Sequence, residues 1–229
     1  VIREAHARGL ELHAWFTPYR SLHKSSQGTV ADSHISRTRP EIVREYGDYL
    51  WLDPGAPAAA EHSLAVMLDV VRRYEIDGVH IDDYFYPYPI TEEVPTANEA
   101  SPKKVKVPFP DDETWQQAQA SMPAELRGLI NRHDWRRNNI NQGVERLYTE
   151  VKQAKPWVKV GISPFGIWRP GHPRQVQGFD QYSEIYADAR KWLREGWVDY
   201  FTPQLYWKIG PPEQSFPALL DWWCEQNVH

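Results

Sequence analysis

The stretch IDGVHIDDYFYPYP, residues 76–89, combines a short apolar strand, two acids and a loop rich in tyrosine and proline. This order of features is the main sequence evidence for the fold. The middle part of the stretch is apolar and β-branched at alternate positions, which is typical of a strand that is buried on one face. Asp82 and Asp83 follow directly, although strand interiors disfavour aspartate. Tyrosines and prolines come next and predict a loop. The two acids therefore mark the point where a strand leaves a sheet.

Three other stretches repeat this order of turn, short apolar strand and loop rich in aromatic residues or proline. They are RGLELHAWFTPYR (8–20), KPWVKVGISPFGIWRP (155–170) and EGWVDYFTPQLYWK (195–208). Apolar residues at helical spacing predict helices between the strands. The predicted helices span 57–74, 134–155, 182–196 and 215–227, and a short helix precedes Gly9. Alternating strands and helices predict parallel βα units.

The loops that leave the strands are longer than those that lead into them. The connections over 17–57 and 84–133 are long, whereas the returns from helix to strand take only a few residues. Such loops are typical of a (β/α)8 barrel whose functional site lies at the carboxyl ends of its strands. Because only four strands are clear, we predict an α/β fold of the parallel (β/α)8 TIM-barrel type, as one partial domain over residues 1–229. An open, doubly wound sheet is the alternative.

Composition excludes several classes of protein. The 229 residues, 41% hydrophobic and 25% charged, suit one soluble globular domain. A formal net charge of -5 argues against nucleic acid and anionic membranes as partners. No stretch is long and apolar enough to span a membrane, and none resembles a signal peptide, although the chain begins without Met inside a helical pattern, as a fragment would. The single Cys224 excludes an intrachain disulfide.

The alternation along each strand predicts which side chains face the site. Barrel residues point in turn outward to the helices and inward to the axis. Val79 and Ile81 suit the outward side, so His80 and Asp82 point inward. The same alternation predicts further inward side chains: His13, Trp15, Thr17, Tyr84, Gly161, Ser163, Tyr200, Thr202, Gln204 and Tyr206.

The acids divide by their position relative to the strands. Asp82, inward at a strand end, is a candidate for catalysis or ligand binding because a buried carboxylate without partners is costly. Asp83 has the opposite parity and suits a loop cap or a supporting carboxylate. Asp77 and Asp199 precede their strands and are expected to be structural, and Asp53 is expected to provide turn and cap contacts before the helix at 57–74.

Five motifs together resemble the glycosyl-hydrolase-like family ten proteins. They are HAWFTPYR, DGVHIDDYFYP, DWRRNNIN, KPWVKVGISPFGIWR and DYFTPQLYW, in this order and spacing. The resemblance implies a bacterial (β/α)8 barrel, secreted or lipid-anchored at the cell envelope, of which this chain carries about strands three to six. It also implies hydrolysis of glycosidic bonds in a polysaccharide, for some members in peptidoglycan glycan strands without stem peptides.

Most glycosidases need two carboxyl groups, one to protonate the leaving oxygen and one to attack the anomeric carbon or activate water. The motif match gives Asp82 and Asp83 as candidate catalytic residues. The second carboxylate stays open among Asp83, an acid outside these strands, and four loop acids: Glu92, Glu93, Asp180 and Glu184.

Substrate would be placed by aromatic faces that stack on sugar rings and by polar groups that bind hydroxyl or carboxylate groups. For each aromatic residue taken singly, core packing remains the alternative. Arg136 and Arg137 oppose the dipole of their helix, which indicates an anionic partner or a solvated helix end. The candidate substrate-binding residues are His13, Trp15, Arg20, His80, Tyr84, Tyr86, Arg137, Asn138, Ser163, Trp168, Arg169, Gln204, Tyr206 and Trp207.

Two other functions stay open. His13, His80 and Asp82 could bind zinc in a metal-dependent hydrolase, but the sequence lacks a paired-histidine motif. Aromatic residues and arginines could also bind a glycan without cleaving it. Under the favoured hypothesis we expect no cofactor and no metal, and the oligomeric state stays open.

Overall fold

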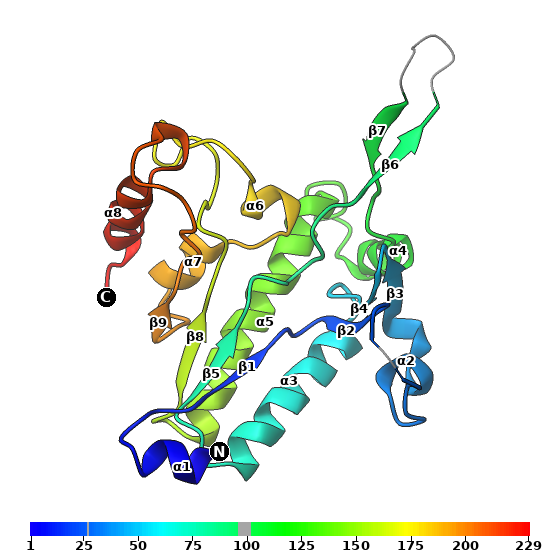
Figure 1. The fold of residues 1–229 in the computed structure, drawn as a ribbon. Coiled ribbons are helices and arrows are strands. Elements are labelled where there is room, and N and C mark those ends of the chain that lie inside the picture. Colours follow the sequence, from blue (N-terminus) through cyan, green and yellow to red (C-terminus); the bar gives the residue numbers. More distant parts are fainter. Residues whose placement is uncertain (27, 96–101) are drawn as a thin grey trace.

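A four-stranded parallel sheet forms the centre of the computed structural model, which describes residues 1–26, 28–95 and 102–229. The strand order is β1-β5-β8-β9 (Figure 1). The four strands therefore lie in the sheet in the same order in which they follow one another along the chain. The four predicted strands are thus confirmed, and the fold is mixed α/β. Within the described residues the sheet does not close into a barrel. The strands are β1 (His13–Phe16), β5 (Gly78–Ile81), β8 (Lys159–Ile162) and β9 (Tyr200–Phe201).

The four strands end level with one another. Phe16 pairs with Ile81, Ile81 with Ile162, and Ile162 with Phe201. The residue that follows each of the last three strands donates its backbone N–H to the last residue of the preceding strand. These hydrogen bonds run from Asp82 to the Phe16 carbonyl, from Ser163 to the Ile81 carbonyl and from Thr202 to the Ile162 carbonyl. The carboxyl ends therefore form a straight edge on which the loop residues begin together.

The helices pack on the outward face of the sheet. Val79, Ile81, Val160 and Ile162 are almost fully buried in the main hydrophobic core, as their alternation predicted. α3 and α5 lie side by side along this face (Figure 1). Burying side chains of this size stabilises the fold by roughly 1.5–3 kcal/mol each. Three predicted helices agree closely with the structure: α3 (Pro57–Arg73), α5 (Arg132–Ala154) and α8 (Phe216–Gln226); a short α1 (Ile2–His6) precedes β1.

The helix predicted over 182–196 is wrong, because the chain forms two short helices there. α6 (Gln181–Glu184) and α7 (Ala189–Arg194) are separated by Tyr186, whose φ of 59° lies in the left-handed region. Side-chain caps mark both starts: Asp180 accepts from the Ser183 N–H and Asp188 from the Lys191 N–H. Local capping chemistry thus outweighs the apolar spacing.

The two long loops contain regular structure that the sequence reading did not predict. The first loop holds an antiparallel sheet of order β2-β4-β3, and the second a two-stranded hairpin that projects from the body (Figure 1). Residues 96–101 of the second loop and residue 27 of the first lie outside the described residues. The elements are β2 (Arg20–His23), α2 (Ile35–Thr38), η1 (Pro40–Ile42), β3 (Val43–Tyr46) and β4 (Tyr49–Leu52), then β6 (Thr91–Val94), β7 (Lys103–Lys106) and α4 (Asp112–Ser121); η2 (Pro212–Gln214) precedes α8.

Asp53 joins the two loops instead of capping α3. Its carboxylate is fully buried, accepts from the Gly55 N–H and the Thr114 hydroxyl, and pairs with Arg44 at 3.1 Å. The turn contact was therefore predicted correctly, whereas the cap was not, because the N-cap residue of α3 is Ala56 and no side chain caps the helix. Burial raises the pKa of Asp53, and its three partners offset part of that effect.

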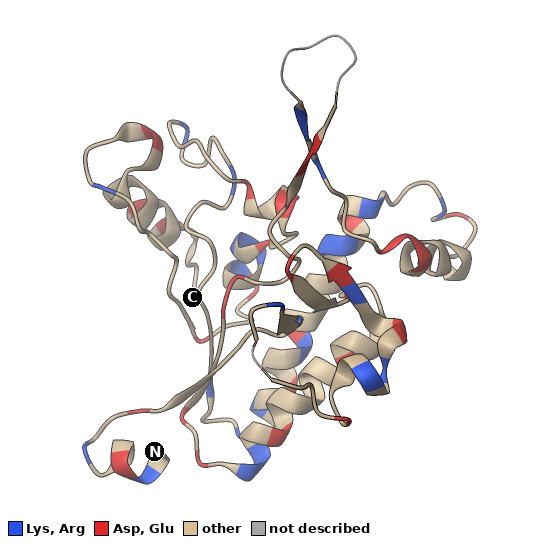
Figure 2. Cartoon of the chain, turned by 45° about the vertical axis from the view of Figure 1, so that its right-hand side comes forward, with Lys and Arg blue, Asp and Glu red and all other residues tan. Residues whose placement is uncertain are grey.

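Charged residues of both signs are mixed along the chain (Figure 2). This distribution agrees with the absence of a broad basic field in the composition. No helix within the described residues combines the length and the apolar character that a bilayer crossing requires.

Asp77 and Asp199 tie the amino ends of neighbouring strands together, as predicted for structural acids. Asp77 accepts from the Leu12 N–H at 2.6 Å and contacts the His6 ring at 2.8 Å. Asp199 accepts from the Val160 N–H at 2.7 Å and pairs with Lys152. The Leu12 N–H, and then His6, lower the pKa of Asp77.

We predict that Asp77→Ala lowers the free energy of unfolding by about 1–2 kcal/mol at neutral pH, because a charge-assisted hydrogen bond to the Leu12 N–H is lost. Since the folded state lowers the pKa of Asp77, this stabilisation is fully present above the unfolded pKa and is lost progressively as the pH falls from there through the lowered folded pKa. Denaturant titrations at pH 7 and pH 3 measure the difference. Asp69→Asn, on the exposed face of α3, is the control; an equal loss at both pH values contradicts the assignment.

Candidate functional site

An open depression of about 600 Å³ lies at the carboxyl edge of the sheet. We call it the Asp82 depression; its walls include Trp15, Asp82, Ser163, Thr202, Gln204 and Tyr206. These residues come from the ends of all four parallel strands and from the loop after β9. The even ends of the strands bring together side chains that are up to 191 positions apart (Trp15 to Tyr206).

The Asp82 carboxylate is held by one oxygen only. Its Oδ1 accepts from the Asp83 N–H at 2.9 Å and from Nε2 of Gln204 at 3.0 Å. The same Gln204 nitrogen donates to the Ser163 carbonyl at 3.0 Å, which orients the amide. Oδ2 has no hydrogen-bond partner among the described residues, and the side chain lines the depression. The carboxylate is thus oriented and keeps one oxygen for chemistry.

Asp83 has a different environment from its neighbour. Its side chain is only 4% exposed, it accepts a short hydrogen bond from the Tyr88 hydroxyl, and it does not line the depression. Burial, and then the negative charge of Asp82, raise the pKa of Asp83 to about 6, against the lowering effect of Tyr88. Asp83 reaches Asp82 through its backbone N–H and also through its carboxyl group, whose hydrogen bond with the Asp82 carboxyl further raises the pKa of Asp83. These contacts suit a supporting residue.

Two glycines make room for a hydrogen-bonded layer on the inward face of the sheet. A Cβ at Gly161 would lie 2.0 Å from the Tyr200 ring, and one at Gly78 would lie 2.4 Å from the His13 ring. The Tyr200 hydroxyl meets Nδ1 of His13 at 2.6 Å and Nδ1 of His80 at 2.9 Å. His80 continues through Nε2 to the Ser163 hydroxyl at 3.0 Å. Burial lowers the pKa of His80, which favours the neutral ring.

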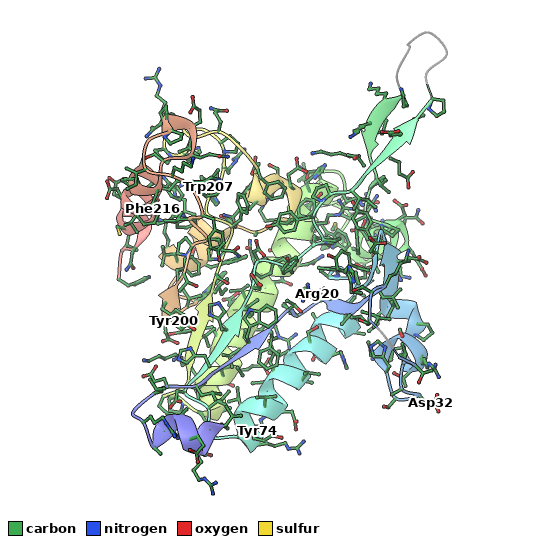
Figure 3. All side chains as sticks on the ribbon, viewed as in Figure 1. Arg20, Asp32, Tyr74, Tyr200, Trp207 and Phe216 are labelled. Carbon is green, nitrogen blue, oxygen red and sulfur yellow. The ribbon has the colours of Figure 1, made fainter. Side chains whose placement is uncertain are left out.

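Exposed apolar side chains surround Asp82. Trp15 is 54% exposed and Tyr206 86%, and Phe216 and Leu220 of α8 complete the wall. Figure 3 shows Phe216 on α8, on the same side of the molecule as Tyr200. Phe216 and Leu220 were not among the predicted site residues. Their spacing of four positions at the start of a helix that follows a barrel strand is the signal that places them there.

Several predicted substrate-binding residues lie away from this depression. His13 sits at the opposite, amino end of β1, and Trp168 is buried with its ring stacked on Trp222. Trp207 packs edge to face on Phe165, against a small second core. Asn138 is exposed on α5. Packing therefore takes up two of the three tryptophans that the sequence offered as sugar platforms, and Trp15 alone of the three lines the depression.

Other predicted residues form separate clusters at the loops. Arg20 lies over the Tyr84 ring at 4.9 Å, and Arg169 lies over the Tyr182 ring at 4.6 Å. Tyr86 and Arg137 line a second depression on the other side of the loop after β5.

The anionic partners that Arg136 and Arg137 require belong to the chain itself. Arg136 pairs with the fully buried Asp111, and Arg137 pairs with Asp134 at 2.6 Å. Asp111 lies one residue before α4, so this ion pair also fastens the second long loop to α5. The unfavourable position of the two arginines in the helix dipole thus correctly indicated anionic partners, and these partners are acids of the same chain.

None of the four loop acids considered as the second carboxylate lines the Asp82 depression. Glu92 and Glu93 are exposed on β6, Asp180 caps α6, and Glu184 pairs with Lys106. Asp82 is the one carboxylate in its lining among the described residues.

The zinc alternative has no ligand set among residues 1–26, 28–95 and 102–229. No three His, Cys, Asp or Glu side chains converge there on a common point. His13 and His80 both direct Nδ1 to the Tyr200 hydroxyl instead.

The parallel sheet with an oriented carboxylate at its carboxyl edge defines the chain as an α/β protein with a candidate site at the strand ends. It belongs to the family described as Glycosyl hydrolase-like 10, which matches residues 1–229. The chain is 38% identical over 232 residues to glycosyl hydrolase YngK of Bacillus subtilis, covering 99% of this chain and 42% of YngK. It is 32% identical over 238 residues to glycosyl hydrolase DigH of Escherichia coli K12, covering 98% and 49%.

The chain thus spans less than half the length of these relatives. Among solved structures, the glycoside hydrolase domain of PgaB (BpsB) from Bordetella bronchiseptica matches 97% of this chain and 59% of that chain, with a TM-score of 0.48 and 15% identity. Alpha-L-fucosidase isoenzyme 2 from Paenibacillus thiaminolyticus matches 88% and 29%, with a TM-score of 0.44 and 15% identity.

We predict that Asp83 contributes stability to the folded state below pH 4 that is absent at pH 7. Because the folded state raises the pKa of Asp83 to about 6, its contribution is fully present below the unfolded pKa and is lost as the pH rises through 6. Asp83→Asn should remove this decline, as measured by the difference in unfolding free energy between variant and wild type from pH 4 to 7. Tyr88→Phe removes the donor and should extend the decline to higher pH. A flat difference for Asp83→Asn contradicts the prediction.

Proposed function

We propose that the protein is a glycoside hydrolase in which Asp82 is one of the two reacting carboxylates. The observation that carries the proposal is the Asp82 carboxylate, fixed through Oδ1 and open through Oδ2 at the carboxyl edge of a parallel sheet. The family and the names of its relatives support the same chemistry.

Asp82 would act through its free oxygen. In a retaining reaction Oδ2 attacks the anomeric carbon as the glycosidic bond breaks, and water later hydrolyses the glycosyl ester; in an inverting reaction Oδ2 accepts a proton from the attacking water. In both, a second carboxyl group protonates the leaving oxygen. Because Asp82 is the one acid in the described lining, this general acid comes from outside the residues that line the depression.

Sugar units would be placed by the exposed side chains around Asp82. The accessible faces of Trp15 and Tyr206 can stack on the apolar faces of sugar rings. Ser163 and Thr202 offer hydroxyl groups next to the carboxylate. The glycan class that we propose is a polysaccharide of the bacterial cell wall, specifically peptidoglycan strands without stem peptides.

The proposal includes the surroundings in which this site operates. We assign the four strands to positions three to six of an eight-stranded barrel, whose other strands would complete the walls around Asp82. We also assign the protein to the cell envelope or the secreted fraction, where such a polysaccharide is found. Support comes from the family resemblance and from relatives more than twice as long as the aligned region.

A non-catalytic glycan-binding function is the second candidate. It is favoured by the single carboxylate in the described lining, since hydrolysis needs two. The exposed aromatic side chains would serve both functions equally.

We predict that Asp82→Asn lowers kcat for peptide-free peptidoglycan strands by about 10²–10⁴-fold in the full-length protein. The amide keeps an oxygen that can accept from the Asp83 N–H and Gln204, so the fold and glycan binding should persist. Released sugar fragments measure turnover, and Asp69→Asn on α3 is the control with full activity. Undiminished cleavage by Asp82→Asn would reject the catalytic assignment, and glycan binding without cleavage by the wild type would favour the second candidate.

We predict that Gln204→Ala lowers kcat about tenfold with little change in KM, because one of the two donors that orient Oδ1 is lost, worth about 1–2 kcal/mol. Gln204→Glu should lower it further, since a carboxylate would replace a donor 3.0 Å from Oδ1. Steady-state kinetics on the same glycan separate the two constants. A rise in KM alone would make Gln204 a substrate-binding residue instead of a positioning residue.

A further inference from the structure

A second depression, of about 530 Å³, lies on the far side of the loop that follows β5. We call it the Arg137 pocket; its lining includes Tyr86, Pro89, Lys106, His133, Arg137 and Glu184. Segment 82–89 contributes to both depressions, with Asp82 in the first and Tyr86, Pro87 and Pro89 in the second. The first turns of α5 form another wall, and α5 begins at the same edge of the sheet at which β5 ends (Figure 1).

Arg137 is a buried cation with an unused donor. The residue is 7% exposed, and its guanidinium lies 3.6 Å from the centre of the Tyr182 ring. Nε donates to the Tyr182 carbonyl at 3.2 Å and one terminal nitrogen, NH1, to Asp134 at 2.6 Å. The other terminal nitrogen, NH2, has no partner among the described residues. Since a guanidinium has five N–H donors and buried charges are costly without partners, this nitrogen is available to an acceptor in the pocket.

Each nitrogen of Arg136, by contrast, already donates to the protein. Its three nitrogens donate to Asp111, to the Phe109 carbonyl and to the Tyr186 hydroxyl. Because the Tyr186 oxygen accepts from Arg136, its own proton is directed to Nδ1 of His133, 3.1 Å away. Neutral His133 then carries its proton on Nε2, which is a second donor at the exposed side of the pocket.

The pocket offers hydrogen-bond donors in place of a flat apolar face. Its three cations each pair with one acid, Lys106 with Glu184, Arg136 with Asp111 and Arg137 with Asp134, so what it offers an anion is the free NH2 donor of Arg137 and not a net positive charge. Tyr86 is 1% exposed and Phe109 6%, so neither ring is accessible for stacking on a sugar. A neutral sugar would therefore find few contacts, whereas a carboxylate would find Arg137 NH2 and His133 Nε2.

We propose that the Arg137 pocket binds the carboxylate of an acidic sugar unit in the glycan substrate. The proposal rests on the function proposed above, because a glycan at Asp82 has to cross segment 82–89 to reach Arg137. The pocket would then select polysaccharides that carry a carboxylate near the cleaved bond, and Arg137 would be a specificity residue that takes no part in bond cleavage.

Binding of single sugars tests the proposal without reliance on turnover. Glucuronic acid and N-acetylmuramic acid are the probes and N-acetylglucosamine is the neutral control, titrated into the full-length protein and followed by the backbone amide signals of residues 133–137. We expect both acids, and not the neutral sugar, to shift these signals, with affinity falling as salt is raised. Arg137→Gln should weaken acid binding about tenfold. Equal shifts by the neutral sugar, or unchanged acid binding in Arg137→Gln, would overturn the proposal.

Two matched variants keep the result interpretable. Arg146→Gln removes another arginine of α5, one that pairs with Glu61 and Glu150 away from the pocket, and should leave acid binding unchanged. Asp134→Asn removes the competing charge beside Arg137 and should strengthen acid binding about threefold, even if Arg137→Gln fails to fold; weaker binding would count against the proposal. Intact acid selectivity in a protein that cleaves no glycan would reject the proposed hydrolase function and leave this pocket assignment standing.

Discussion

The in-register pairing of four parallel strands is the constraint on which the rest of this structure depends. The strands end in one row, and their side chains alternate in direction, so the first inward positions beyond that row lie next to one another. Asp82 and Ser163 occupy two of these positions. A slip of one residue in β5 would turn Asp82 toward the helices and bring Ile81 to the inward face. The apolar outward face, with Val79 and Val160 fully buried, prevents that slip.

Polar side chains perform different tasks at the two ends of the sheet. At the amino end, Asp77 and Asp199 each accept a backbone N–H from a neighbouring strand and are satisfied by it. At the carboxyl end, Asp82 is satisfied on one oxygen only. The difference follows from position: a carboxylate at the start of a strand finds N–H groups that have no partner in the ladder, whereas the inward residue after its end faces the open depression. This asymmetry is what separates a structural acid from a candidate reacting group of the same residue type.

The two long loops are held in place by buried charges. Asp53 links Arg44 to Thr114, and Asp111 binds Arg136 of α5, so both loops are fastened to each other and to the helix layer. The loop after β5 is fixed as well, because Tyr88 donates to Asp83. Buried polar networks that are fully satisfied hold the loops rigidly, so these contacts position the loop residues that line the Arg137 pocket, among them Tyr46 and Phe109.

The sequence by itself determined the parallel strands, three of the longer helices, the inward direction of Asp82 and the structural use of Asp77, because these depend on local periodicity and on the order of elements along the chain. It also carried the family resemblance. The tertiary structure alone decided the break at Tyr186, the hairpin and helix inside the second loop, the burial of Trp168 and Asp83, and the packing of Trp207 on Phe165. These outcomes depend on partners that are distant in sequence, such as Trp222 for Trp168. The position of a tryptophan in the sequence does not tell whether its ring packs on another ring or on a ligand.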